Sequence, residues 1–210
     1  MCGRYSPLTE AELIEVREII REVSLRIAND DFLDYSRPPS EMFPTDHAPV
    51  ITGHGQGTVS FESLKWGFKH WTGKGVIINA RAETLQTKNM FKGLLNAGRC
   101  VVPANEYYEW EKKGKDKIKH FIKDQGGNIL FMAGLYREGE NGKEFVIITK
   151  DSYGDVVSVH DRMPVILRAD QIEAWLSGAL SPDDIVKLDF NAEVMPCDGE
   201  DLQLSLLDFV

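Results

Sequence analysis

Five strand-like segments follow one another between Cys100 and Thr149, and only short connections separate them. Each segment is rich in β-branched or aromatic residues, and each of the longer gaps contains glycine, the residue typical of tight turns. The segments are residues 100–102, 107–111, 118–122, 129–135 and 145–149, and the turn glycines are Gly114, Gly126, Gly127, Gly139 and Gly142. This spacing predicts a mainly antiparallel, barrel-like sheet at the centre of the fold.

A few helices and a hairpin are expected around this sheet. Thr9 and Glu12 have the spacing of a capping box, and apolar residues follow at helical intervals, so residues 9 to about 26 are predicted to be a helix. The other expected elements are a loop at 31–46, a hairpin of 49–52 with 58–61, a strand at 76–78, a helix through Phe91 that Gly98 ends, a strand at 163–167, a helix at 170–176 and a helix starting at Ser181. The chain has 210 residues, of which 42% are hydrophobic, and we expect one α+β domain over residues 1–210.

Charge and cysteine content limit the class of protein. The net charge of −9 argues against a protein that coats nucleic acid non-specifically, although Arg4, Arg81, Arg99 and Arg162 leave a local positive groove open. Three widely spaced cysteines do not form a disulfide framework, which fits the reducing cytoplasm. No stretch approaches the roughly 18 apolar residues that a membrane helix needs, so we expect no membrane association.

Cys2 occupies a position that gives a thiol unusual chemistry. Methionine is normally removed before a small residue, and Cys2 would then carry both a thiol and an α-amine with a pKa of about 7.7 to 8.0. Such a 1,2-aminothiol condenses with an aldehyde to an imine, and the neighbouring sulfur closes a thiazolidine ring. The alternative is a small residue of no chemical consequence beside the start of the chain. Cys2 alone favours the second interpretation, so the rest of the chain must decide.

Two further residues could move protons. His160 lies on a loop before an expected strand and could donate a proton to a sugar oxygen. It could equally be a hydrogen-bonded loop residue beside a surface ion pair. In the strand around Glu109, alternation sets Tyr107 and Glu109 on one face, where burial among aromatic rings is expected to raise the carboxyl pKa. A paired structural glutamate is the alternative.

Asn79, Arg81 and Trp66 complete the candidate residues. Asn79 and Arg81 follow an expected strand, where sites are commonly built, but Asn79 could instead cap a helix and Arg81 could pair with Glu83. Trp66, like Trp71 and Trp110, is more typical of a core, although it could stack on a base. The histidines and cysteines lack metal-ligand spacing and no phosphate-binding glycine motif occurs, so we expect no metal and no other cofactor.

Five motifs occur in one order: Met1-Cys2-Gly3-Arg4-Tyr5, Lys65-Trp66-Gly67, Asn79-Ala80-Arg81-Ala82-Glu83-Thr84, Pro103-Ala104 with Tyr108-Glu109-Trp110, and Val159-His160-Asp161-Arg162-Met163-Pro164. Together they closely resemble, over residues 1–178, the SOS response-associated peptidase (SRAP) family, the abasic-site shielding proteins. The resemblance implies that Met1 is removed, by the protein itself or otherwise. Cys2 would then link covalently to the aldehyde of an abasic site in single-stranded DNA and protect it during replication. A monomer with a C-terminal helix and tail at 179–210 is expected.

The resemblance also implies roles for individual residues. Cys2 would supply amine and thiol, Asn79 would hold the amino terminus, Glu109 would move protons on the amine, and His160 would assist sugar ring opening. Arg4, Arg81 and Arg162 would bind phosphates, and Trp66 would lie near the unstacked DNA. DNA lyase activity is implied as a side path of the imine.

This chain departs from the family pattern at four places, which are residues 43–46, residues 68–75, Ala82 and the Asn105-Glu106 pair. None of them removes an expected catalytic group, but they bear on how DNA is held. Two other functions stay open from the sequence. One is an amidase in which Cys2 is an amino-terminal nucleophile, and the other is a module that binds DNA without a covalent bond.

Overall fold

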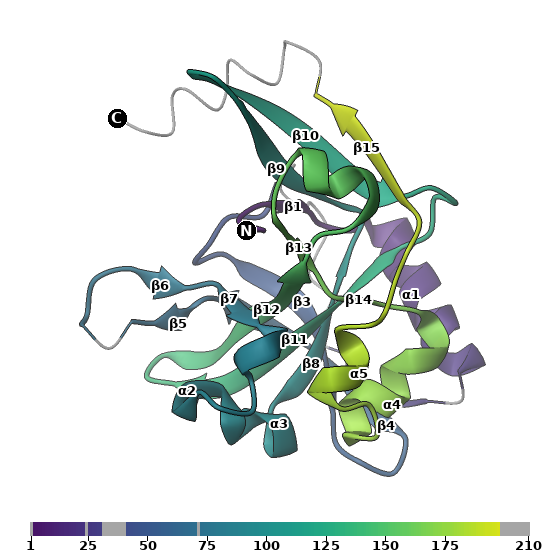
Figure 1. Ribbon diagram of the computed structural model, residues 1–210. Helices are drawn as coiled ribbons and strands as arrows, with labels where there is room; N and C mark the ends of the chain where they lie inside the picture. The colour runs from purple at the N-terminus through teal and green to yellow at the C-terminus, as the bar shows by residue number, and fades with distance from the viewer. Residues whose placement is uncertain (1, 24, 31–40, 71, 198–210) are drawn as a thin grey trace.

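A closed five-stranded barrel forms the centre of the computed structural model, which describes residues 2–23, 25–30, 41–70 and 72–197 (Figure 1). Its strands are β3 (His47–Gly53), β4 (Thr58–Trp66), β8 (Arg99–Ala104), β11 (Leu130–Gly139) and β12 (Gly142–Asp151). The ring runs β12-β11-β8-β3-β4 through antiparallel pairs, and a parallel pairing of Phe145 with Trp66 joins β12 back to β4. The predicted α+β class and the mainly antiparallel, barrel-like sheet are therefore confirmed.

Alternation along the strands divides the core into two clusters. Val50, Val102 and Ile147 belong to the cluster that contains Cys2 and lies inside the barrel. The intervening residues Ile51, Val101 and others face the helices and form the outer cluster. Because successive side chains on a strand point to opposite faces, one set of strands supplies both cores.

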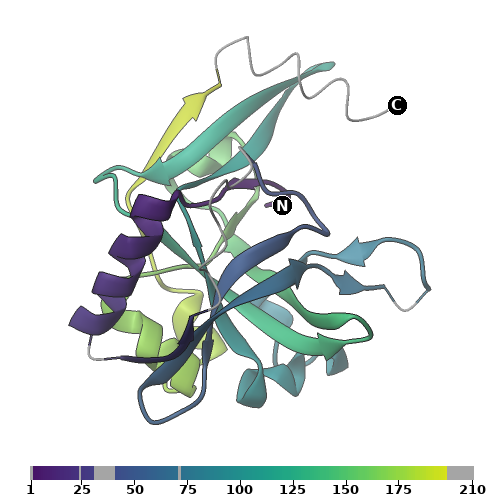
Figure 2. The same ribbon diagram turned by 180° about the vertical axis from the view of Figure 1, so that it is seen from behind.

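A second sheet lies over one end of the barrel (Figures 1 and 2). It is antiparallel throughout, in the order β1 (Tyr5–Ser6), β9 (Glu106–Lys113), β10 (Asp116–Asp124) and β15 (Ala192–Pro196). Only a helix and a tail were predicted from residue 179 onward, so β15 was missed. All five residues of β15 are half-buried or exposed. The strand therefore lacks the alternation of apolar and polar residues that would predict it from the sequence. Residues 198–210 lie outside the described part of the chain.

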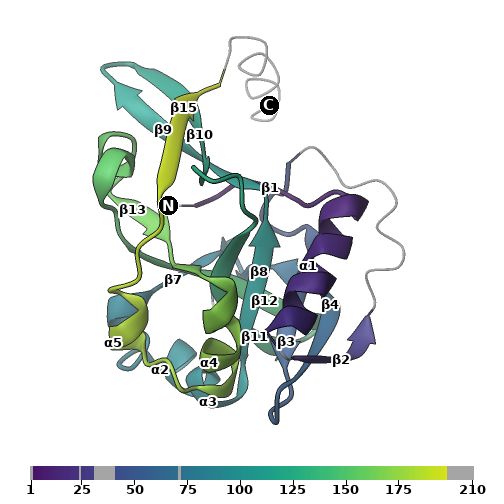
Figure 3. The ribbon, with the colours of Figure 1, turned by 90° about the vertical axis from the view of Figure 1, so that its right-hand side faces the viewer.

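Helices cover the outside of the barrel. In Figure 3, α1 lies against one part of the barrel, and α4 and α5 lie against another part. The capping box of Thr9 and Glu12 is present at the start of α1 (Glu10–Glu22), and Leu13, Val16 and Ile20 are buried. The helix ends before the expected residue 26, because β2 (Arg26–Asp30) pairs with β4 there. Ser181 caps α5 (Pro182–Ile185) as predicted, and α4 spans Ile172–Ser177. No described helix is both long and apolar enough to cross a bilayer.

Two local expectations need correction. The predicted helix through Phe91 is two short helices, α2 (Asn89–Lys92) and α3 (Leu94–Ala97), separated by Gly93. Gly98 ends α3 as predicted, with a φ of −137°, and a Cβ there would lie 2.2 Å from the backbone oxygen of Tyr136. The expected strand at 163–167 is β13 (Arg162–Pro164) followed by β14 (Ile166–Leu167).

The segment that carries Asn79 also differs from the prediction. Residues 76–78 are half-buried rather than buried, and β6 (Val76–Ile77) pairs with β5 (Phe68–Lys69) in a small hairpin. Asn79 begins a separate strand, β7 (Asn79–Arg81), which runs parallel to β12 in register with Ile147. This pairing carries Asn79 to the barrel end that the second sheet covers. The expected loop at 31–46 lies largely outside the described residues.

Candidate active site

The first described residue, Cys2, lies between the barrel and the second sheet, and its side chain is fully buried. Two contacts fix the backbone beside it. Tyr5 pairs with Tyr107 of β9, and the side-chain amide of Asn79 donates a 2.8 Å hydrogen bond to the carbonyl oxygen of Cys2. The other amide atom of Asn79, Oδ1, is buried and has no hydrogen-bond partner among the described residues. It is therefore available to a donor that enters the site.

The thiol of Cys2 is protonated in this environment. Burial raises its pKa well above the ordinary value, and the negative charge of Glu109 raises it further. The Sγ atom lies 3.9 Å from the carbonyl oxygen of Arg4. A thiolate is therefore disfavoured here, and chemistry at this residue needs a nearby proton acceptor.

Glu109 can serve as that acceptor. It lies on β9, its side chain is 3% exposed, and burial raises its pKa to about 7, where it can both accept and release a proton. The pKa rise expected from the alternating aromatic strand is confirmed. Tyr107 and Glu109 lie two residues apart on β9, so they point to the same face of the sheet, and both are buried.

His160 lies across from this carboxylate, with 4.0 Å between its Nε2 atom and Oε2 of Glu109. Its other ring nitrogen, Nδ1, accepts a 3.0 Å hydrogen bond from the backbone N–H of Arg162 and also lies 2.8 Å from Asp161. One nitrogen cannot accept from the first and donate to the second. The backbone bond decides the tautomer, because the Asp161 side chain is 86% exposed and free to turn away. Burial lowers the pKa of His160, so the neutral ring carries its proton on Nε2, toward Glu109.

The arginines expected at phosphates have different surroundings. Arg81 is exposed at the end of β7. Arg162 is buried and donates two 2.9 Å hydrogen bonds to Glu83, as well as bonds to Asp151 and to the carbonyl oxygen of Thr149. Four bonds within the protein occupy its two terminal nitrogens, so a phosphate would have to displace one of these partners.

Arg4 is likewise paired inside the protein. Its Nη1 atom lies 3.2 Å from Glu41, and its guanidinium stacks on the rings of Phe43 and Trp110, at 4.2 and 5.1 Å from their centroids. Glu41 also accepts a hydrogen bond from Lys119, which is 3% exposed. Arg4, Glu41 and Lys119, the Glu41 cluster, thus join the first strand, the 41–46 segment and β10.

Trp66 supports the site from within the barrel. It has no exposed surface, its indole N–H donates a 3.1 Å hydrogen bond to Ile78, and its ring contacts Tyr5 and Phe145. A direct contact with DNA would require the residues that cover it to move. Trp71, also considered in the sequence, lies outside the described residues.

Residues from four separate segments therefore meet at one barrel end: Cys2, Asn79, Glu109 and His160. They combine a fixed backbone, a carboxyl group that titrates near neutrality and a neutral imidazole. No set of three His, Cys, Asp or Glu residues in the described ranges is arranged to hold a metal ion. The arrangement can move protons at an amine or thiol of Cys2.

Comparison with known proteins agrees with this assembly. The family model of the SOS response associated peptidase (SRAP) matches residues 1–203. The chain belongs to the SRAP family. The SRAP chain is 31% identical to the abasic site processing protein YoqW of Bacillus subtilis, with 97% of this chain and 90% of YoqW aligned. It is 34% identical to the abasic site processing protein YedK of Escherichia coli, over 86% of this chain and 82% of YedK.

Solved structures share the SRAP fold. A crystal structure of a Bacteroides thetaiotaomicron protein matches with a TM-score of 0.75 at 22% identity, covering 96% of this chain and 94% of that one. A phage-related protein of Bordetella bronchiseptica matches with a TM-score of 0.68 at 24% identity, covering 94% of each chain. At these identities the likeness concerns the fold.

Sequence reasoning missed three charged residues of this SRAP site. Glu83 was considered as a partner of Arg81, but it binds Arg162, which is 79 positions away in the chain. Lys119 belongs to a run of lysines around a turn that the sequence predicts to be solvated, and this prediction is wrong for Lys119, whose side chain is 3% exposed and bound to Glu41. Glu41 itself was not considered. The only available signal for Glu41 was its position next to the unusual 43–46 segment.

Proposed function

We propose that, once Met1 is removed, Cys2 forms a covalent thiazolidine with the ring-opened aldehyde of an abasic site in single-stranded DNA. The bond would shield the lesion from strand cleavage during replication. Membership of the SRAP family supports the proposal, as do relatives that are named abasic site processing proteins. The observation that carries it is the hydrogen bond from Asn79 to the Cys2 carbonyl, beside a carboxyl group with a pKa of about 7.

The proposed reaction needs no oxidant or cofactor. The α-amine of Cys2 attacks the aldehyde carbon, a proton moves from nitrogen to oxygen, and water leaves to give an imine. The sulfur of Cys2 then adds to the imine carbon while the thiol proton passes to nitrogen. One C–N bond and one C–S bond form, and one water molecule is released.

Each polar residue has a separate task in this scheme. Asn79 fixes the Cys2 backbone, and its free Oδ1 accepts a hydrogen bond from the new amine. Glu109 removes a proton from the ammonium group and returns one to the departing hydroxyl, a cycle suited to a pKa of about 7. His160, protonated on Nε2, donates to the ring oxygen of the closed sugar and so favours the open aldehyde.

Two finer activities follow from the same scheme. The imine activates the neighbouring sugar carbon toward β-elimination, so DNA lyase activity is a side path that closure of the thiazolidine suppresses. We further propose that the chain hydrolyses its own Met1–Cys2 bond, with Glu109 as the base that activates water. Glu109→Gln protein would then retain Met1, which intact mass measures directly.

The mass of the intact protein before and after exposure to single-stranded DNA with one abasic site tests the main proposal. Wild type should lose Met1 and then gain the mass of one DNA strand minus one water, at one chain per lesion, as expected for a monomer. Cys2→Ala should give no stable product. Cys2→Ala and Cys2→Ser both keep the α-amine but lack the sulfur, so each should give only an imine, which borohydride traps, and an increased yield of cleaved strand. Cys197→Ala, at a half-buried cysteine outside the site, is the matched control.

If wild-type protein with a free Cys2 gives no heat-stable product, the proposal is wrong. Turnover of small amides without DNA would instead support an amidase. We favour the crosslink because burial raises the pKa of the Cys2 thiol, whereas an amidase relies on a thiolate nucleophile. Equal DNA affinity for wild type and Cys2→Ala, with no covalent product, would identify a binding module.

A further inference from the structure

The side chain of Tyr107 on β9 is fully buried, and it carries a hydroxyl that the fold does not use. Its Oη atom is buried and has no hydrogen-bond partner among the described residues. Buried hydroxyls in proteins are usually paired, because burying one without a partner costs free energy. Phenylalanine would fill the same space without this cost, so the stability of the free protein does not account for the hydroxyl.

Tyr107 lies beside the reactive residues of the site. It belongs to the core cluster that contains Cys2. The backbone N–H of Tyr108 donates a 2.9 Å hydrogen bond to the carbonyl oxygen of Arg4, which holds the first strand against β9 two residues after Cys2. Because Tyr107 and Glu109 are two residues apart on β9, their side chains point to the same face of the sheet. The phenol and the carboxyl group are therefore neighbours on one face.

The phenol keeps its proton at physiological pH. Burial raises the pKa of Tyr107 well above its ordinary value, and the nearby Cys2 thiol and Glu109 carboxyl group raise it further. Both groups are thus close enough to influence the hydroxyl electrostatically. The hydroxyl is a fixed hydrogen-bond donor in this position and does not act as a base.

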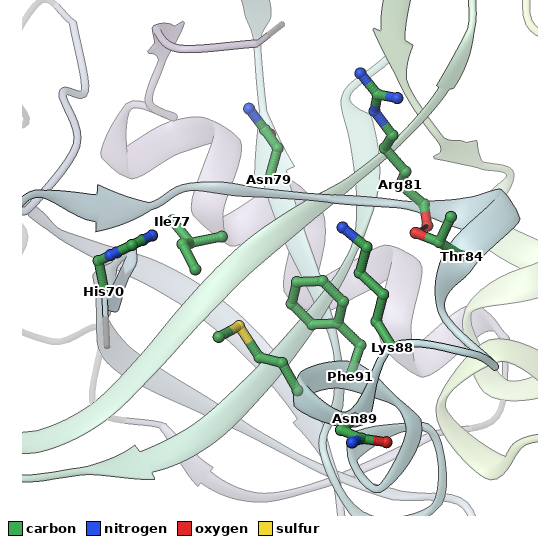
Figure 4. A pocket seen from close by; sticks show the side chains of 9 residues that line it. His70, Ile77, Asn79, Arg81, Thr84, Lys88, Asn89 and Phe91 are labelled. Carbon is green, nitrogen blue, oxygen red and sulfur yellow. Dashed lines mark hydrogen bonds between the residues drawn. The ribbon is translucent and has the colours of Figure 1, made fainter. Parts of the chain in front are cut away.

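The hydroxyl is also shielded from solvent. Asn79 lines a cavity of about 560 Å³ next to the Cys2 site (Figure 4). The other lining residues all belong to the 70–91 part of the chain, and no residue of β9 is among them. A hydrogen bond from Tyr107 therefore forms away from this cavity, in surroundings of low dielectric constant where such bonds are strongest.

The proposed reaction at Cys2 requires a hydrogen-bond donor that the residues assigned so far do not supply. Negative charge develops on the aldehyde oxygen when the amine attacks the carbonyl carbon. The amide nitrogen of Asn79 is bound to the Cys2 carbonyl, and Glu109 is itself an anion after it takes the ammonium proton. His160 is engaged at the ring oxygen of the sugar. A neutral, buried hydroxyl beside these groups suits the aldehyde oxygen.

We propose that Tyr107 is a further catalytic residue, whose hydroxyl donates a hydrogen bond to the aldehyde oxygen of the abasic residue. The hydrogen bond stabilises the negative charge that forms as the C–N bond is made. Glu109 carries two protons in turn from the amine nitrogen to this oxygen, which leaves as water, and Tyr107 keeps its own proton throughout. The inference deepens the proposed function and rests on it.

Tyr107→Phe removes the oxygen and keeps the ring, and its effects on rate and on stability should have opposite signs. The single-turnover rate of adduct formation at saturating abasic DNA should fall about 10-fold or more, because loss of one such donor costs roughly 100- to 1,000-fold in acyl-transfer enzymes. The melting temperature of the free protein should rise by about 2–4 °C, the shift expected when one unpaired buried hydroxyl is removed from a chain of this length. A tyrosine hydroxyl that only supports the fold would cost stability when removed.

Two controls separate the chemical step from binding and from packing. The affinity for a strand with a reduced abasic analogue, which has no aldehyde, should be equal for Tyr107→Phe and wild type. Tyr136→Phe is the matched variant, because Tyr136 is a half-buried tyrosine on β11 whose charged neighbours are Lys143 and Glu62. It should react at the wild-type rate.

Equal rates for Tyr107→Phe and wild type would overturn the inference. A slower rate together with a lower melting temperature would also overturn it, because the hydroxyl would then have a partner within the fold. These outcomes are distinct from failure of the proposed function. An adduct that forms at the wild-type rate without the hydroxyl removes only the role of Tyr107, whereas wild-type protein with a free Cys2 that forms no adduct rejects both.

Discussion

Asn79 reaches across from β7 to the backbone of Cys2, and the 2.8 Å hydrogen bond between them joins residues 77 positions apart. The bond leaves the amine and thiol of Cys2 unused, because it engages only the carbonyl oxygen. The parallel pairing of β7 with β12 fixes Asn79, so the rigid barrel wall sets the orientation of the reactive residue.

Asn79→Asp is expected to slow formation of the Cys2 adduct without unfolding the protein. The carboxylate has the same shape as the amide but cannot donate a hydrogen bond to the Cys2 carbonyl. A carboxylate oxygen of Asp then faces the carbonyl oxygen of Cys2, and the two repel each other. A lost buried hydrogen bond of about 1–3 kcal/mol corresponds to a rate roughly 5- to 150-fold lower. Single-turnover rates at saturating DNA measure the effect, and Asn96→Ala, at an exposed position on α3, is the control. Equal rates for wild type and Asn79→Asp would show that the contact has no part in the reaction.

Glu109 is expected to make stability fall as pH rises from about 4.5 to about 7. Its ordinary pKa of 4.5 is raised to about 7 by burial, so in this window the folded state binds a proton that the unfolded state releases. At about 1.4 kcal/mol per pKa unit, the loss is roughly 3 kcal/mol, complete above pH 7 and absent below 4.5. Glu109→Gln removes the titration. Its melting temperature relative to wild type should therefore rise between pH 5 and pH 8, and a constant difference would contradict the shifted pKa.

The elements built from local signals were predictable from the sequence. The capping box of Thr9 and Glu12 marks the start of α1, and alternation around Glu109 gives the face on which that residue lies. Both rest on neighbours within a few residues. In the same way, Ser181 and Pro182 mark α5.

Features that depend on distant pairings were not predictable. Closure of the barrel depends on the pairing of Phe145 with Trp66, and the position of Asn79 depends on β12, which lies some 70 residues further along the chain. The partners of Arg162 and Arg4 are of the same kind, because an arginine carries no sequence signal for the carboxylate it binds. The local sequence around an arginine that binds a phosphate is the same as that around an arginine that pairs with a carboxylate inside the protein.

Gly98→Ala is expected to destabilise the fold by about 2 kcal/mol or more. The added Cβ would lie 2.2 Å from the backbone oxygen of Tyr136. That oxygen belongs to β11 and cannot move without disturbing the strand, because the N–H of Tyr136 also donates a hydrogen bond to the carbonyl oxygen of Gly98. Chemical denaturation measures the change. Gly93→Ala is the matched control, because a Cβ on Gly93 meets nothing within 4 Å. Similar losses for the two variants would mean that the close approach at Gly98 is easily relieved.

Glu41→Gln is expected to release Arg4 toward DNA. In the Glu41 cluster, one carboxylate lies between Arg4 and the buried Lys119, so it neutralises an arginine for which the motif resemblance implies a phosphate contact. Loss of that charge should strengthen binding of single-stranded DNA at low salt and increase the salt slope by about 0.7. The same change leaves Lys119 without its counter-charge, which should lower the free energy of unfolding by about 3 kcal/mol. Glu111→Gln, at a carboxylate of similar exposure that lies 3.7 Å from His120, is the control. A stability loss with an unchanged salt slope would show that Arg4 stays on Phe43 and Trp110 and serves only to hold the first strand.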